Sequence, residues 1–173
     1  MRYYGYVFEK NIYLCIVNLN NQTIMAYPAL QIANQLLLYS ADKGEELMTN
    51  MKLQKMLYYQ QGFHLAYFGT PLFDEDIEAW MYGPVVPVIY EEYKINGRNG
   101  IEPNSELFFS FEQKKELALF DEVCKVYGAY SAIGLMNMTH EEMPWKSTPT
   151  GEGEGHIISK EKMQSFFKKR LKD

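Results

Sequence analysis

The segment from Asn50 to Phe68 limits the possible folds of this chain more than any other part of the sequence. Thr49 or Asn50 can cap exposed backbone N–H groups at its start, and Gly69 ends the helical pattern. Gly62, in the middle, costs about 1 kcal/mol relative to Ala, which is acceptable where another backbone packs closely. We therefore predict one long helix. Its expected inner face consists of Leu53, Met56, Leu57, Phe63, His64, Tyr67 and Phe68.

Helical patterns on both sides of this segment predict further helices. Ser110, with Gln113 three residues later, has the form of a capping box, and Ser131 and Ser159 are further N-cap candidates. Apolar spacing places these helices at about residues 28–44, 85–97, 110–128, 131–138 and from 159 onward.

A short β element accompanies the helices. Period-two alternation predicts a strand from Ile77 to Tyr82, which Gly83 and Pro84 break. Ile157 and Ile158 are expected to pair with it. The expected fold is mainly α, a compact bundle of about five to six helices with a small two- or three-stranded antiparallel β element.

The chain length and the start of the helical pattern define the domain organisation. With 173 residues there is room for one domain, which we place at residues 26–173. Residues 1–25 alternate loosely and end in the turn-like stretch 18–21. They are either a hairpin or a poorly ordered upstream extension.

The charge of the chain disfavours nucleic acid as a partner. Its net charge is −5, whereas phosphate backbones are bound by clustered Lys and Arg. Two small basic groups, Lys52 with Lys55 near the expected exposed start of the long helix and residues 168–170, are more typical of solvated faces. Aromatic residues make up 15% of the chain, so many rings must be buried or used as contacts.

Cysteine use and hydropathy predict a cytoplasmic protein without a membrane segment. Cys15 and Cys124 are far apart and match no metal or redox spacing, so we interpret them as reduced thiols. The apolar run from Ile12 to Val17 is too short to cross a bilayer.

Catalytic and metal-binding patterns are weak. His140 lacks a second histidine at helical spacing, and His64 on the predicted inner face is interpreted as a satisfied core histidine. The acidic run from Asp74 to Asp76 is typical of a solvated turn, because consecutive carboxylates on a loop cannot all face one point. We therefore predict no catalytic residue, no metal and no cofactor.

Three blocks of the sequence resemble the Panacea or SocA-like antitoxin domain. They are KLQKMLYY at 52–59 followed by Gly62, WMYGPV at 80–85 followed by Tyr90, and HEEMPW at 140–145. The resemblance extends over about residues 27–171, with similar intervals between the blocks, and leaves the first 25 residues outside.

This resemblance implies a mainly helical antitoxin of a bacterial or phage toxin-antitoxin pair. Such a protein neutralises a cognate toxin, encoded by an adjacent gene, through direct protein–protein binding and without catalysis. Some family members instead act as adaptors that deliver the toxin to an ATP-dependent protease, and others are known only as phage-associated proteins. A small hydrolase or nucleotide-modifying enzyme using His64 or His140 is the remaining alternative.

We expect partner binding to use residues of the three blocks, either as contacts or as supports of the binding face. Trp80 and Tyr82 are expected on the same strand face, with Trp145 packed beneath them. The candidate partner-binding residues are Lys52, Lys55, Tyr59, Trp80, Tyr82 and Trp145.

Overall fold

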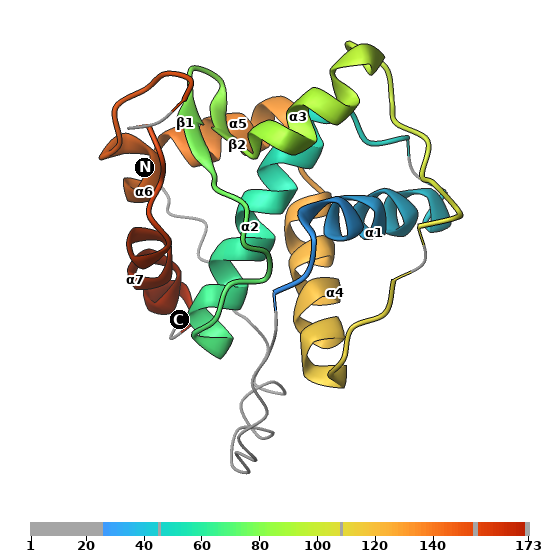
Figure 1. Ribbon diagram of the computed structural model, residues 1–173, viewed down its shortest axis with the longest axis horizontal. Coiled ribbons are helices and arrows are strands. Elements are labelled where there is room, and N and C mark those ends of the chain that lie inside the picture. Colours follow the sequence, from blue (N-terminus) through green and yellow to red (C-terminus); the bar gives the residue numbers. More distant parts are fainter. Residues whose placement is uncertain (1–25, 45, 108, 154–155, 172–173) are drawn as a thin grey trace.

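The computed structural model describes residues 26–44, 46–107, 109–153 and 156–171, and these residues form a mainly helical fold (Figure 1). The expectation for residues 1–25 lies outside the described residues. The elements are α1 (Ala29–Asp42), α2 (Asn50–Phe68), β1 (Glu78–Trp80), β2 (Gly83–Val85), α3 (Pro87–Tyr93), a 3-10 helix (Lys94–Asn96), α4 (Lys114–Gly128), α5 (Ala132–His140), α6 (Met143–Lys146) and α7 (Lys160–Arg170). The predicted mainly α fold with a small antiparallel β element is confirmed. None of the described helices is long and apolar enough to span a bilayer.

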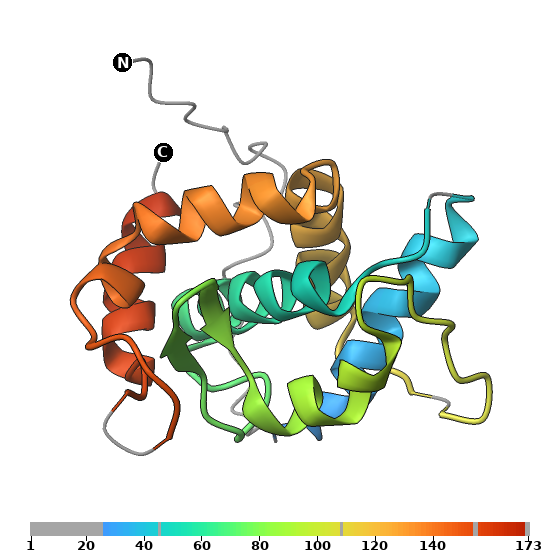
Figure 2. The ribbon, with the colours of Figure 1, turned by 90° about the horizontal axis from the view of Figure 1, so that it is seen from above.

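Helix α2 lies at the centre of the fold, with the other elements around it (Figures 1 and 2). It packs against α1, α3, α4, α5, α7 and β2. Its predicted ends are confirmed, because the Thr49 side chain accepts from the Lys52 N–H and Gly69 adopts a left-handed conformation after Phe68. Every residue from Leu53 to Ala66 is buried. The prediction that only one face of this helix is buried was therefore wrong.

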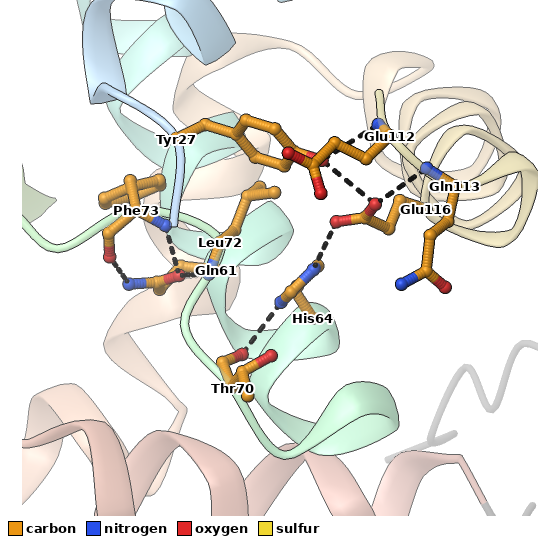
Figure 3. A network of polar contacts seen from close by, with 9 residues as sticks. All are labelled: Tyr27, Gln61, His64, Thr70, Leu72, Phe73, Glu112, Gln113 and Glu116. Carbon is orange, nitrogen blue, oxygen red and sulfur yellow. Dashed lines mark hydrogen bonds and ion pairs between the residues drawn. The ribbon is translucent and has the colours of Figure 1, made fainter. Parts of the chain in front are cut away.

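Buried polar side chains of α2 bind the backbone of the segments around the helix. Gln54 Oε1 accepts from the Val86 N–H at 2.8 Å. Gln61 Oε1 accepts from the Leu72 N–H at 2.7 Å, while its Nε2 donates to the Phe73 carbonyl at 2.7 Å (Figure 3). A buried polar group is tolerated when it is hydrogen-bonded in this way. These bonds explain why a helix with a polar-looking face is enclosed on all sides.

Gly62 is the point of closest approach between α2 and α7. A Cβ atom at this position would lie 2.1 Å from Cε2 of Phe167. The Phe167 ring is fully buried and also packs edge-on against Tyr58 and Phe63, with centroid distances of 5.4 and 4.8 Å. The close packing that makes a glycine tolerable at this position comes from an aromatic ring of α7.

The β element is a hairpin with one additional bridge. Strands β1 and β2 pair antiparallel, with Glu78 opposite Val85. The predicted pairing with residues 157–158 is confirmed by the Glu78–Ile157 bridge and by the Ile158 N–H, which donates to the Ile77 carbonyl at 2.8 Å. The strand predicted to reach Tyr82 ends at Trp80, where the chain turns and returns as β2. The residues that we expected only to break a strand therefore begin the second one.

The starts of the later helices follow local capping rules. Ser131 and Ser159 cap α5 and α7 as predicted, by accepting from the N–H groups of the residues three positions later. The capping box of α4 joins Gln113 to Glu116, so the box predicted between Ser110 and Gln113 was placed three residues too early.

Candidate partner-binding site

The three sequence blocks meet beside the β1–β2 hairpin. From α2, Lys55 Nζ donates to the Pro84 carbonyl at 3.0 Å. From α6, the indole N–H of Trp145 donates to the Trp80 carbonyl at 3.0 Å. The hairpin is therefore held on one side by α2 and on the other by the α5–α6 corner.

Gly83, the first residue of β2, allows the hairpin to lie directly on these supports. Its φ of +99° is a conformation that residues with a side chain rarely adopt. A Cβ atom here would lie 2.8 Å from Lys55 Cε and 2.9 Å from Thr139 Oγ1. Both the conformation and the close approach require glycine.

The turn between the strands presents two large apolar side chains to solvent. Met81 is 69% exposed and Tyr82 is 61% exposed. Just before the turn, the Trp80 ring packs against Tyr90 at a centroid distance of 4.9 Å and donates from its N–H to Glu78 at 2.7 Å. Because the backbone on both sides of the turn is hydrogen-bonded, the exposed pair is presented by a well-supported turn.

Lys55 is a buried ionisable residue of this site, which is unusual for a lysine. Its side chain is 1% exposed, and burial lowers its pKa to about 7. Burial also lowers the pKa of His140, and the positive charge of Lys55 lowers it further. Burial thus makes Lys55 easier to deprotonate than an exposed lysine, and its Nζ serves the hairpin as a hydrogen-bond donor.

We expect Lys55→Met to change the pH dependence of stability. Between a folded-state pKa of about 7 and the ordinary lysine value of 10.5, the unfolded chain binds more protons at this position than the folded one. The stability of the natural protein relative to Lys55→Met should therefore increase with pH, by up to about 1.4 kcal/mol per pH unit. Urea unfolding at several pH values measures this difference. The exposed Lys125→Met controls for loss of a positive charge, and a pH-independent difference would contradict the prediction.

His64 belongs to a buried polar network that joins the starts of α1 and α4 to α2 (Figure 3). Its Nδ1 lies 2.8 Å from the Thr70 carbonyl and its Nε2 lies 3.4 Å from Glu116 Oε1. The other oxygen of Glu116 accepts from the Tyr27 hydroxyl at 3.0 Å and from the Gln113 N–H at 3.1 Å. The interpretation of His64 as a satisfied core histidine is confirmed.

His140 lies at the end of α5 in a different environment. Its ring stacks on Trp145 at a centroid distance of 4.1 Å, and the Met81 backbone nearby partly offsets the effect of burial on its pKa. Its Nε2 is buried without a hydrogen-bond partner among the described residues. The ring thus connects the hairpin turn to α6.

Glu142 forms a second buried network that the sequence did not indicate. Its carboxylate accepts from the hydroxyls of Tyr58 and Tyr59 at 2.9 and 3.1 Å and pairs with Arg170 at 2.9 Å. Burial raises the pKa of Glu142, and the charge of Arg170 opposes this increase. Two adjacent tyrosines in a buried helix were the available signal, because buried hydroxyls need partners.

The candidate residues occupy different environments. Lys55 and Tyr59 are buried, so the expectation that Lys55 lies at an exposed helix start was wrong. Lys52 is half-buried and donates to the Gly128 carbonyl at 2.7 Å. Four of the candidates lie in the hairpin or contact it: Lys55, Trp80, Tyr82 and Trp145. Of these four, Tyr82 is exposed. Trp80 and Tyr82 do not share a strand face, since Tyr82 lies in the turn. A role of all six residues in binding stays a prediction.

The acidic run at residues 74–76 supports neighbouring helices. Glu75 accepts from the Ala29 N–H at the start of α1, and Lys160 of α7 lies 3.5 Å from Asp76. Within the described ranges, no group of three or more His, Cys, Asp or Glu residues could hold a metal ion.

The fold and the site define a mainly helical domain that carries a supported β-hairpin with an exposed apolar turn. The model of the family described as "Antitoxin SocA-like, Panacea domain" matches residues 53–146, which include most of the three blocks. The chain belongs to this family.

A curated relative agrees with the family match over a shorter segment. The chain is 42% identical over 72 residues to Antitoxin SocA of Caulobacter vibrioides (strain NA1000 / CB15N). The alignment covers 40% of this chain and 36% of the relative, a little over one third of its length. No solved structure matches the chain.

Proposed function

We propose that this protein is an antitoxin that neutralises a cognate toxin, encoded by an adjacent gene, by binding it directly and without turnover. The domain responsible spans residues 26–173, and the β1–β2 turn lies at the centre of its binding face. The observation that carries the proposal is the exposure of Met81 and Tyr82 on a turn that all three family blocks support. Large apolar side chains on a preorganised turn are typical anchors of protein interfaces.

The surroundings of His64 support a binding role over a hydrolytic one that uses this residue. His64 is 2% exposed, and both of its ring nitrogens contact groups of the protein itself. A general base must come within hydrogen-bond reach of a substrate proton. An enzyme using His64 would first have to release this network.

Co-expression with the neighbouring gene tests the proposed function. We expect the partner alone to stop growth, and this protein to restore growth and to co-purify with the partner in a fixed ratio. Growth arrest that persists in its presence, with no complex recovered, would show that the antitoxin proposal is wrong.

Partner half-life separates direct blocking from delivery to an ATP-dependent protease. Blocking predicts that the partner persists, bound and inactive, whether or not the protease is active. If the partner disappears faster in the presence of this protein and only when the protease is active, the protein is an adaptor and the blocking mechanism is wrong.

We expect the double variant Met81→Ala/Tyr82→Ala to weaken toxin binding by about 30-fold or more, as for interface anchors worth 2 kcal/mol or more. Its free energy of unfolding should change by less than about 1 kcal/mol, because both side chains are exposed. Calorimetric titration and thermal unfolding measure the two quantities. Ile95→Ala, which removes a 91% exposed apolar side chain from the 3-10 helix, is the matched control. Unchanged affinity in the double variant would place the binding face elsewhere.

A further inference from the structure

Helix α7 concentrates positive charge in an acidic protein. Between Lys160 and Arg170 it carries five basic residues and one acidic residue, Glu161, whereas the whole chain has a net charge of −5. Lys168, Lys169 and Arg170 suit the C-terminal dipole of the helix. The dipole does not explain Lys162, which lies in the first turn.

An open groove of about 420 Å³ runs between α6 and α7. Its apolar lining comes from Met143, Pro144 and Phe166, and Met143 is 60% exposed. Lys162 and Lys169 also line it. Because Lys162, Phe166 and Lys169 are spaced by four and three residues, they lie on one face of α7. The groove therefore combines an apolar contact surface with two positive charges.

The two lysines are available to a carboxylate. Among the described residues neither Lys162 nor Lys169 forms an ion pair. Lys162 Nζ donates instead to the Ser147 carbonyl at 3.2 Å, across the groove from α7 to the end of α6. A carboxylate is a stronger acceptor than a carbonyl for an ammonium group. The lining contains one acidic residue, Glu161, and two lysines, so it carries an excess of positive charge.

We propose that the α6–α7 groove binds an acidic amphipathic helix of a partner protein. Apolar side chains of that helix would cover Met143 and Phe166, and its carboxylates would pair with Lys162 and Lys169. Apolar helix faces are commonly bound in grooves of this kind, and methionine adapts to varied apolar surfaces. Nucleic acid fits less well, because phosphates gain nothing from the apolar lining.

Helix α6 contributes residues to both the groove and the hairpin site. Helix α6 supplies Met143 and Pro144 to the groove, while its Trp145 holds the β1 carbonyl of Trp80. The inference rests on the proposed function only where the partner is taken to be the toxin. Binding of an acidic helix to the groove is a separate claim with its own test.

Fluorescence anisotropy with the full chain tests the groove directly. The probe is a fluorescein-labelled amphipathic helical peptide with Leu and Phe on one face and Glu on the other. We expect saturable binding that falls by about 10-fold or more in the double variant Lys162→Glu/Lys169→Glu, because two attractive pairs become repulsive. The variant Lys114→Glu/Lys125→Glu makes the same change in net charge on α4 and should bind like the natural protein.

Two further probes define what would overturn the proposal. The same peptide with Lys in place of Glu should bind at least about 10-fold more weakly, as should a labelled DNA duplex. Absence of saturable binding by the Glu peptide, equal loss in the control variant, or tighter binding of DNA at the same lysines would each refute it. Thermal unfolding of every variant verifies folding. Because the toxin is not used, failure here is distinguishable from failure of the co-expression experiment.

Discussion

Gly62→Ala is expected to destabilise the folded protein by about 2 kcal/mol or more. Alanine favours helix by about 1 kcal/mol, but overpacking of a closed core costs typically 1–3 kcal/mol and occasionally more. Here the new Cβ would lie 2.1 Å from the ring of Phe167, which is buried against α2 and cannot swing into solvent. We therefore expect the clash to outweigh the gain. Urea unfolding followed by far-UV circular dichroism measures the loss.

Two further variants assign the effect to this contact. Gly128→Ala, at the end of α4, adds a methyl group where no atom of the described residues lies within 4 Å, apart from the chain neighbours and the backbone of the same helix, and should be neutral or slightly stabilising. Gly62→Ala/Phe167→Leu should be less destabilised than the sum of its single variants, because the smaller side chain makes room. If Gly62→Ala were as stable as the natural protein, α7 would not be packed on α2 as described.

Arg170→Met is expected to cost about 3 kcal/mol at neutral pH. Removing one partner of a buried ion pair leaves an uncompensated charge, and the cost is reduced here because the Arg170 side chain is 35% exposed. Among the described residues, Glu142, whose side chain is 3% exposed, would retain only the two tyrosine hydroxyls as partners. Chemical unfolding at pH 7 measures the cost. The exposed pair of Glu141 and Lys146 provides the control Lys146→Met, expected to cost less than about 1 kcal/mol.

Acidification distinguishes loss of charge pairing from loss of packing. Without Arg170 the folded-state pKa of Glu142 should rise further above its ordinary value of 4.5, because burial is then less opposed. The loss of stability caused by Arg170→Met is present at pH values where the Glu142 carboxylate is ionised in the folded protein. It declines as the pH falls toward the pKa of Glu142 in the unfolded chain. The difference between Arg170→Met and the natural protein should therefore shrink between about pH 7 and 5. A difference that stays constant would mean that packing, not charge, is lost.

The residues that carry the family resemblance mainly support the β1–β2 hairpin. Lys55, Tyr59 and Glu142 are buried, and each holds another element through a hydrogen bond. The exposed members of the three blocks are Met81 and Tyr82 in the turn and Glu141 and Met143 at the α5–α6 corner.

Several elements were predictable because their signals are local. Thr49, Ser131 and Ser159 accept from N–H groups three residues later, and Gly69 ends α2 in a left-handed conformation. A cap needs only neighbouring residues, so its sequence pattern is nearly sufficient. The hairpin partner of β1 was missed because Gly83-Pro84 normally marks a break. Only the contacts with Lys55 and Thr139 explain why this glycine begins a strand.

Sequence patterns alone predicted the mainly α class, the ends of α2, the serine caps, the pairing of residues 157–158 with the first strand, and the family. Which side chains are buried, what fills the space at Gly62, and which partners satisfy Glu142 and Lys55 depend on how the elements pack. The physical reason is distance along the chain. Capping and periodicity act within a few residues, whereas Glu142 meets Tyr58 across 84 positions and Gly62 meets Phe167 only after α7 has packed.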